Sequence, residues 1–350
     1  MNPRSSISYL VLFVCFAGTA IAQSGRVKPG EAPVPSPTPK RSIYVPTILP
    51  LPSTSPTPKK DDDEVIKVDS ALVPIPVSVL DSNGRAITNL KLTDFELRID
   101  GRPAEIGDLA RSETPIRLAM LFDNSSSVRV AREFEKDAAV RFFRQVVRPD
   151  KDLASLFSVS TTTRMEQGLT RDVSLLVNAI EMFPQPEGAT ALLDGLTLAA
   201  EYLGGVQGRR VIVIVSDGDD TISDLSFEQM LKAIQIANCQ VYVVKTTDFE
   251  NYKRTGVRGG NANLRQLAAE RRMIELTRQT GGNVYSPIDE DELDRAFRQI
   301  SAELSQQYIL SYYPDDELEK RGEFREIGIT VKTKPAAAVR TRKGYYVPKK

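Results

Sequence analysis

An apolar segment that ends in a carboxylate and two hydroxyl groups constrains the fold of this chain more than any other feature. Residues 118–122 read Leu-Ala-Met-Leu-Phe and are followed by Asp123, Ser125 and Ser127. A continuous apolar segment is typical of a strand buried on both faces of a parallel sheet. Open sheets of this kind bind ligands outside the carboxyl ends of their strands. We therefore expect the three polar residues at a functional edge, on a loop that precedes a helix predicted over 129–147.

Two later segments place further oxygen donors at the same edge. Thr190 precedes a helix predicted over 191–203, and Asp217 follows a second apolar strand predicted over 211–216. Carboxylate and hydroxyl oxygens are hard ligands that suit Mg²⁺ or Mn²⁺. A simpler interpretation is also open, in which Ser125 and Ser127 only cap the helix that follows them.

Together, Asp123, Ser125, Ser127, Thr190 and Asp217 resemble the metal-ion-dependent adhesion site of the von Willebrand factor type A family. They fill every position of that pattern, in the family's order and with similar separations. The resemblance implies that Ser125 and Ser127 are direct ligands of Mg²⁺ or Mn²⁺, and that Thr190 binds directly or through water. It implies that the two Asp residues supply charge and orient waters and hydroxyls. It also implies that an open position on the cation takes an Asp or Glu carboxylate from a protein partner.

Composition narrows the classes of function. The chain has 350 residues, no His, and equal numbers of basic and acidic residues, so its formal net charge is zero. The lack of His removes imidazole bases and Ser-His-Asp systems, and zero net charge gives no general attraction to nucleic acid. No Gly-x-x-x-x-Gly-Lys-Ser/Thr phosphate loop is present. We therefore expect a metal-dependent binding or adhesion protein and not an enzyme. The alternative is a cell-envelope scaffold whose domain the metal makes rigid, and a hydrolase has little support.

The N-terminal segment is typical of a secretory signal. Residues 1–22 combine Arg4, an apolar core over 7–16 and the small-x-small sequence Ala20-Ile-Ala22. We expect export to an extracytoplasmic location (periplasmic, cell-envelope-associated or secreted), with no transmembrane segment after cleavage. A lipid anchor at Cys15 is the alternative. Without Cys15, Cys239 is the single Cys of the mature chain, and we expect it to be a small buried apolar residue.

The remainder divides into a linker, an α/β domain and two β-rich flanks. Pro-rich residues 23–63 predict a disordered linker. Residues 113–306 alternate predicted strands and helices, which indicates an α/β fold with a doubly wound, mainly parallel, Rossmann-like sheet. Residues 64–112 and 307–350 are β-rich. Because short strands need partners, we expect these flanks to form one β-sandwich-like region around the inserted α/β domain. No feature specifies an oligomeric state.

Smaller features complete this organisation. Pro74 and Pro76 predict an edge strand or a stretch before a strand. Residues 248–260 are typical of a polar loop near the ligand edge. Asp194 is left outside the site because it has two interpretations, a role behind the ligands or an Arg pair. An acidic segment after Asp217 is interpreted as a solvated loop and not as a second cation site, and its acidic residues are Asp219, Asp220 and Asp224.

Overall fold

The computed structural model describes residues 72–111, 114–258, 263–314 and 320–348. These residues belong to one compact unit, Ile66–Lys350. The expected signal segment, the Pro-rich linker and Cys15 lie outside the described residues, so export and anchoring stay predictions. None of the helices in the described ranges combines the length and apolarity needed to cross a lipid bilayer.

Apolar strands form a six-stranded sheet in the order β10-β9-β8-β5-β6-β7. All neighbours are parallel except β7, which runs antiparallel to β6. The central strands β5 and β8 are buried along nearly their whole length, as continuous apolar segments predict. The strands are β5 (Ile116–Asp123), β6 (Leu153–Val159), β7 (Thr163–Thr170), β8 (Arg209–Ser216), β9 (Cys239–Lys245) and β10 (Val284–Tyr285).

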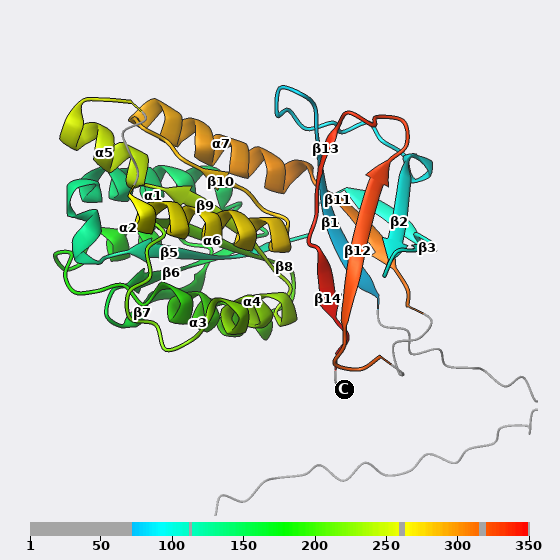
Figure 1. Cartoon of the computed structure of the whole chain (residues 1–350), viewed down its shortest axis with the longest axis horizontal. Helices are drawn as coiled ribbons and strands as arrows, with labels where there is room; N and C mark the ends of the chain where they lie inside the picture. Colours follow the sequence, from blue (N-terminus) through cyan, green and yellow to red (C-terminus); the bar gives the residue numbers. More distant parts are fainter. Residues whose placement is uncertain (1–71, 112–113, 259–262, 315–319, 349–350) are drawn as a thin grey trace, which may run out of the picture. The chain divides into compact units, whose positions relative to one another are not determined.

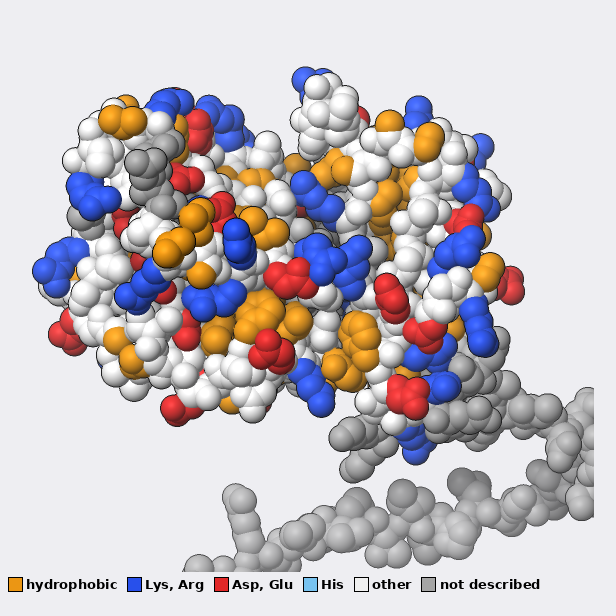
Figure 2. All heavy atoms as spheres, viewed as in Figure 1, with side chains coloured by type: hydrophobic (Ala, Val, Ile, Leu, Met, Phe, Trp, Pro, Cys, Tyr) orange, Lys and Arg blue, Asp and Glu red, His pale blue; other side chains and the backbone are white. Residues whose placement is uncertain are grey.

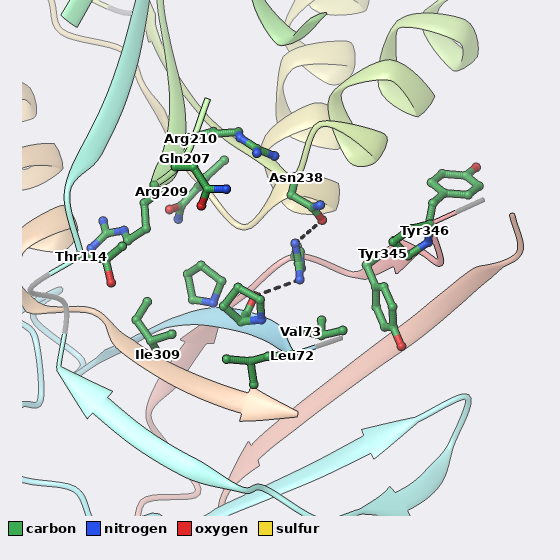
Figure 3. Close-up of a pocket in the computed structure, with 16 residues that line it drawn as sticks. Leu72, Val73, Thr114, Gln207, Arg209, Arg210, Asn238, Ile309, Tyr345 and Tyr346 are labelled. Carbon is green, nitrogen blue, oxygen red and sulfur yellow. Dashed lines mark hydrogen bonds between the residues drawn. The ribbon is translucent and has the colours of Figure 1, made fainter. Parts of the chain in front are cut away.

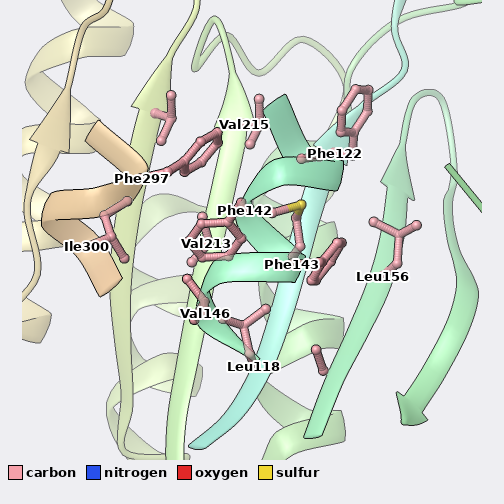
Figure 4. Packing of buried hydrophobic residues seen from close by; sticks show 14 of the residues in the cluster. Leu118, Phe122, Phe142, Phe143, Val146, Leu156, Val213, Val215, Phe297 and Ile300 are labelled. Atoms are coloured by element: carbon pink, nitrogen blue, oxygen red, sulfur yellow. The ribbon is translucent and has the colours of Figure 1, made fainter. Parts of the chain in front are cut away.

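Helices cover both faces of this sheet, so the predicted doubly wound α/β fold is confirmed. Phe142 of α1 and Phe297 of α7 pack against Leu118 and Val213 on one face, as Figure 4 shows. Leu196 of α3 belongs to a separate apolar cluster on the other face. The helices of the first face are α1 (Arg132–Val146), α2 (Val173–Glu181) and α7 (Glu290–Gln306). Those of the second face are α3 (Leu192–Gly204), α4 (Phe227–Ile236) and α6 (Leu264–Thr280).

The prediction of a polar loop over 248–260 is wrong, because Thr247–Thr255 form helix α5. Phe249 is buried and stacks on Phe134 of α1, with ring centroids 3.7 Å apart and an interplanar angle of 6°. Acidic residues in the first turn and basic residues in the last turn complement the helix dipole. Gly256 ends the helix with a φ of 69°. One buried aromatic side chain in a polar segment is too weak a periodic pattern to reveal a helix.

Both β-rich flanks contribute to two four-stranded sheets, in the orders β13-β1-β11-β4 and β14-β12-β2-β3 (Figure 1). The predicted sandwich-like region built from both ends of the chain is therefore confirmed. The first sheet contains β1 (Val73–Leu80), β4 (Asp108–Arg111), β11 (Tyr308–Tyr312) and β13 (Ala338–Arg340). The second contains β2 (Phe95–Ile99), β3 (Arg102–Ala104), β12 (Phe324–Val331) and β14 (Gly344–Tyr346), and the short 3₁₀ helix η1 (Leu92–Asp94) precedes β2.

The register of these sheets joins segments that are far apart in sequence. Ile75 of β1 pairs with Leu310 of β11, and Ile99 of β2 pairs with Ile327 of β12. All four side chains belong to one apolar cluster that draws on both sheets. Alternate residues of β12 are buried, which is the period expected of a strand with one face on a core.

The two prolines lie inside β1, so the interpretation that they precede a strand is wrong. The half of β1 that contains them nevertheless resembles an edge, because Val73–Val77 pairs only with β11, whereas β13 pairs with the other half. On the free side, the carbonyl of Pro76 accepts a hydrogen bond from Thr341 Oγ1 at 2.9 Å, and that of Pro74 accepts one from Arg342 Nη2 at 2.9 Å. Pro lacks the N–H that a second neighbouring strand would need.

Candidate metal centre

The candidate site lies where the strand order of the α/β sheet reverses. From β5 the chain passes to β6 on one side, and β8 then pairs with β5 on the other side. Ligand crevices form at such switch points, outside the carboxyl ends of the strands. Phe122 of β5 is aligned with Val215 of β8. The residues that follow them, Asp123 and Ser216, therefore leave the sheet side by side.

Asp123 is 1% exposed, and both its carboxylate oxygens accept hydrogen bonds. Oδ1 accepts from the backbone N–H of Ser125 at 2.9 Å, and Oδ2 accepts from the hydroxyl of Ser216 at 2.6 Å. Burial and the neighbouring carboxylate of Asp217 raise the pKa of Asp123 to about 6, although these hydrogen bonds lower it. The hydrogen bonds thus fix the orientation of the carboxylate, but both of these donors are neutral, so its negative charge is not balanced by them.

Ser125 and Ser127 turn their hydroxyl groups toward each other. Their Oγ atoms lie 2.9 Å apart, within hydrogen-bond distance. Ser125 precedes the 3₁₀ helix η2 (Ser126–Val130), but its side chain makes no capping hydrogen bond. The interpretation of Ser125 as a mere helix cap is therefore wrong. The hydroxyl of Ser127 also hydrogen-bonds to Asp217.

Backbone hydrogen bonds bring Thr190 to the same place. The N–H of Ser126 donates to the carbonyl of Gly188 at 3.2 Å, which ties the two loops together. Gly188 has a φ of 79°, and a Cβ there would lie 2.3 Å from Thr161 Oγ1, so this approach requires glycine. The carbonyl of Thr190 in turn accepts from the N–H of Thr221 at 2.8 Å. Thr190 itself is 3% exposed.

Asp217 lies half-buried beyond the end of β8. Burial raises its pKa, against hydrogen bonds from the N–H of Asp219 at 2.9 Å and from Ser127. Thr247, at the start of α5, donates its hydroxyl proton to the carbonyl of Asp217 at 3.2 Å. These bonds set the carboxylate beside the two serine hydroxyls.

The structure brings all five predicted residues together at one end of the sheet. Hydrogen bonds link Asp123 to Ser125, Ser125 to Ser127 and Ser127 to Asp217. The three hydroxyl residues, Thr190 included, line a pocket of about 340 Å³.

The donor set fits a hard cation that takes hydroxyls and water as well as carboxylates. In the described part of the chain, no three His, Cys, Asp or Glu residues cluster closely enough to hold a metal ion by themselves. Two carboxylates and three hydroxyls are all oxygen donors, which suit Mg²⁺ or Mn²⁺. That these residues bind metal stays a prediction.

One buried and one half-buried glutamate near the site were missed by the sequence interpretation. Glu135 of α1 is 0% exposed. Burial, together with Asp123 and Glu250, raises its pKa well above the ordinary range. Glu250 of α5 accepts a hydrogen bond from Thr246 Oγ1 at 3.1 Å, and its pKa rises to about 8 through burial and the charge of Asp217. Four acidic groups therefore interact electrostatically at this edge.

A sequence signal for Glu135 does exist. It precedes Ala138, Ala139 and Phe142 by three, four and seven residues, so it falls on the apolar face of the helix. A Glu at a core position indicates a buried acid. Glu250 has no such signal, because α5 itself was not predicted.

The other acidic residues of this region serve the structure of the loops. Asp194 accepts hydrogen bonds from the N–H groups of Asp224 and Leu225, both at 3.1 Å. Asp220 accepts from Leu192 N at 2.8 Å at the start of α3. Asp219 pairs with Arg265 of α6 at 2.5 Å. The acidic loop is therefore tied to its neighbours and is not simply solvated.

Cys239, at the start of β9, is 4% exposed and is a free cysteine. Burial raises the pKa of its thiol to about 12. A thiol this hard to ionise is not reactive at neutral pH. The prediction of a small buried apolar residue is confirmed.

Comparison with known proteins gives one family match. The family model for the von Willebrand factor type A domain matches residues 118–219. This range contains all five residues of the candidate site. No curated protein matches the chain.

Solved structures that match part of this chain include the PilB minor pilin from Streptococcus sanguinis, at 14% identity and a TM-score of 0.43. That match covers 57% of this chain and 63% of the pilin. BatB from Bacteroides thetaiotaomicron matches at 14% identity and a TM-score of 0.42, covering 54% of this chain and 98% of BatB. Proximal thread matrix protein 1 from the mussel byssus, with a zinc-occupied MIDAS motif, matches at 15% identity and a TM-score of 0.45. That match covers 58% of this chain and 48% of the mussel protein.

Proposed function

Because the family model for the von Willebrand factor type A domain matches residues 118–219, we propose that this chain is an exported, metal-dependent binding protein. Asp123, Ser125, Ser127, Thr190 and Asp217 would hold Mg²⁺ or Mn²⁺. When bound, the cation supplies an electropositive position that attracts an Asp or Glu side chain of a protein partner. The proposed location is extracytoplasmic, as the sequence of residues 1–22 predicts.

The observation that carries this proposal is that two carboxylates held in place by hydrogen bonds lack a Lys or Arg partner among the described residues. Within the described ranges, neither Asp123 nor Asp217 forms an ion pair with Lys or Arg, and both have raised pKa values. Buried carboxylates are stable when they are paired or bound to a metal. Hydroxyls of Ser125 and Ser127 beside them complete an oxygen donor set.

The pocket supports binding of a partner side chain at this position. Ser125, Ser127 and Thr190 line it together with Arg265 and Ile222. Ile222 is 43% exposed, so an apolar group stands beside the polar donors. An acidic side chain of a partner would thus meet hydroxyls, one apolar contact and the guanidinium of Arg265, which Asp219 of the same pocket already pairs.

Hydrogen bonds of the protein itself join the loops of the site, which favours binding over a purely structural role for the cation. Ser126 is joined to Gly188 and Thr190 to Thr221 by backbone hydrogen bonds. The scaffold alternative requires the metal to supply the rigidity that these bonds already provide. We propose no enzymatic activity, since the chain has no His and therefore neither an imidazole base nor a Ser-His-Asp system.

The visible face in Figure 2 shows Lys and Arg interspersed with Asp and Glu. A field of a single sign, which nucleic-acid binding needs, is not present on that face. This supports a protein partner that is recognised at one site and not through broad charge attraction.

The test is capture of partners from a cell-envelope extract on the immobilised protein, in Mg²⁺ and in chelator. We expect one or more proteins to be retained in Mg²⁺ and released by chelator. The double variant Ser125→Ala, Ser127→Ala should retain none while its far-ultraviolet circular dichroism stays native. The control Asp224→Ala changes an exposed acid of the neighbouring loop and should bind as the wild type does. Equal capture in chelator would contradict the proposal and favour the scaffold.

A further inference from the structure

A cavity remote from the metal centre is lined by three arginines and, within the described ranges, by no acidic residue. Its volume is about 390 Å³. Arg209 and Arg210 come from the start of β8, and Arg342 lies between β13 and β14. Figure 3 shows Arg209 and Arg210 on the side of the α/β domain, facing Val73 and Ile309 of the first β-sheet.

The arginines of this cavity form no ion pair with any residue that the structure describes. In the described part of the chain, each guanidinium donates to neutral oxygens and forms no ion pair. Arg210 donates to the carbonyls of Val206 at 2.9 Å and Ala237 at 2.8 Å. Arg342 donates to Asn238 Oδ1 and to the carbonyl of Pro74, the two bonds dashed in Figure 3.

Several of the guanidinium donors have no acceptor among the described residues. Arg209 is 8% exposed, and its Nη1 donates to the carbonyl of Leu304 at 2.9 Å, while its Nε and Nη2 are buried without a hydrogen-bond partner there. The same is true of Nε of Arg342. Burial lowers the pKa of both groups to about 10, so both stay charged at neutral pH. A buried charge with free donors is costly unless an anion pairs with it.

The remaining walls of the cavity are apolar. Pro74, Pro76 and Ile309 contribute to one wall, and the buried ring of Tyr345 to another. Arg342 lies over that ring, with its guanidinium carbon 5.9 Å from the ring centroid. A cavity of this size and lining suits a small molecule with an apolar body and a charged head.

We propose that this cavity binds a small organic oxyanion, with its phosphate or carboxylate head on the arginines and its apolar body against Tyr345 and the prolines. Arginine recognises both kinds of head through paired N–H···O hydrogen bonds. The site is separate from the metal centre, so it does not depend on the proposed function of that centre.

The test is isothermal titration calorimetry on the full chain at constant ionic strength. The probes are inorganic phosphate, phenyl phosphate and benzoate. We expect phenyl phosphate or benzoate to bind with a Kd at least tenfold lower than that of inorganic phosphate. The probe that binds more tightly shows whether the site prefers a phosphate or a carboxylate group. Absence of binding by both organic anions would overturn the proposal.

Variants locate the binding. Arg210→Gln and Arg342→Gln should each raise the Kd of the tighter probe at least tenfold. Arg278→Gln removes one charge from an exposed Arg of α6, which pairs with Glu275, and should leave the Kd unchanged. If the Gln variants lose their native circular dichroism, Arg209→Lys keeps the charge but removes the Nε and Nη2 donors, and should weaken binding likewise. Unchanged binding in a folded variant would contradict this site.

Discussion

The hydroxyl of Ser216 donates a hydrogen bond of 2.6 Å to Oδ2 of Asp123, across the neighbouring strands β8 and β5. The same hydroxyl oxygen accepts from the N–H of Gly218 at 3.0 Å. This serine immediately precedes Asp217, so one residue ties both acidic strand ends together. It is 0% exposed and was not among the residues predicted for the site.

Replacing Ser216 by Ala should impair metal binding in a pH-dependent way. The change removes a hydrogen bond that lowers the pKa of Asp123, so that pKa should rise above its value of about 6. A cation needs the ionised carboxylate, and the Kd for Mn²⁺ should therefore increase more at pH 6 than at pH 8. Calorimetric titration at the two pH values checks this.

The matched control for that variant is Ser155→Ala. Ser155 is equally buried in β6, but its hydroxyl donates to the carbonyl of Leu118 at 3.1 Å. Loss of that bond should lower stability by about 1–3 kcal/mol without changing the pH profile of metal binding. Identical profiles for both variants would show that Ser216 has no special role.

Asp217→Ala should abolish stabilisation by metal. A cation at 100 times its Kd adds about 2.7 kcal/mol to the free energy of unfolding, which corresponds to a rise in Tm of about 5–10 °C for a domain of this size. We expect that rise in the wild type and in Asp224→Ala, and none in Asp217→Ala. Scanning calorimetry with Mg²⁺ and with chelator measures it. A full rise in Asp217→Ala would place the cation elsewhere.

The metal-free protein should lose stability as pH rises from about 4.5 to about 8. Burial and Asp217 raise the pKa of Glu250 from 4.5 to about 8. Over this range the unfolded chain releases the proton and the folded chain keeps it, so the free energy of unfolding falls with pH. The pKa of Glu135 is raised in the same direction. Denaturant titrations in chelator at several pH values measure the slope.

The variant Glu250→Gln should flatten this slope, because the amide does not titrate. Glu201→Gln, an exposed position of α3, should leave it unchanged. Saturating Mg²⁺ should also flatten the slope, since a nearby cation favours the ionised carboxylates. A stability that rises with pH in chelator would contradict the assignment.

Removal of residues 308–350 should expose the N-terminal flank. Strand β2 pairs with β12 from Phe95 to Ile99, and β1 pairs with β11 from Val73 to Val77. Without these partners, β2 keeps only the three-residue β3 as a neighbour, which is marginal in water. Amide exchange should therefore lose its protection over Phe95–Ile99 while β5 stays protected. Retained protection of β2 would show that the N-terminal flank is stable alone.

The strands and the site loops of the α/β domain follow from local sequence. Residues 118–122 and 211–215 are continuous apolar segments, and each ends at a polar residue where the strand leaves the sheet. Since parallel strands end at a common edge, Asp123 and Asp217 could be predicted to be close. The pairing of the two flanks followed from the need of short strands for partners.

Other features depend on contacts that no local pattern contains. Helix α5 forms because Phe249 stacks on Phe134, more than a hundred residues away in sequence. Pro74 and Pro76 enter a strand because side chains from the segment between β13 and β14 satisfy their carbonyls. The arginine cavity likewise gathers residues from β8 and from the C-terminal flank. The local pattern of charged and apolar residues carries no information on contacts between residues that are far apart in sequence.

Arg111 of β4 pairs with Tyr308 of β11, so the strands before and after the α/β domain are adjacent. If this contact forms while the chain is still unfolded, it closes a flexible loop of roughly 200 residues, at an entropic cost of about 5 kcal/mol. Once the inserted α/β domain has folded, its two ends are already near each other and most of that cost is gone. The connectivity therefore favours an order of assembly in which the sandwich closes after the domain that it encloses.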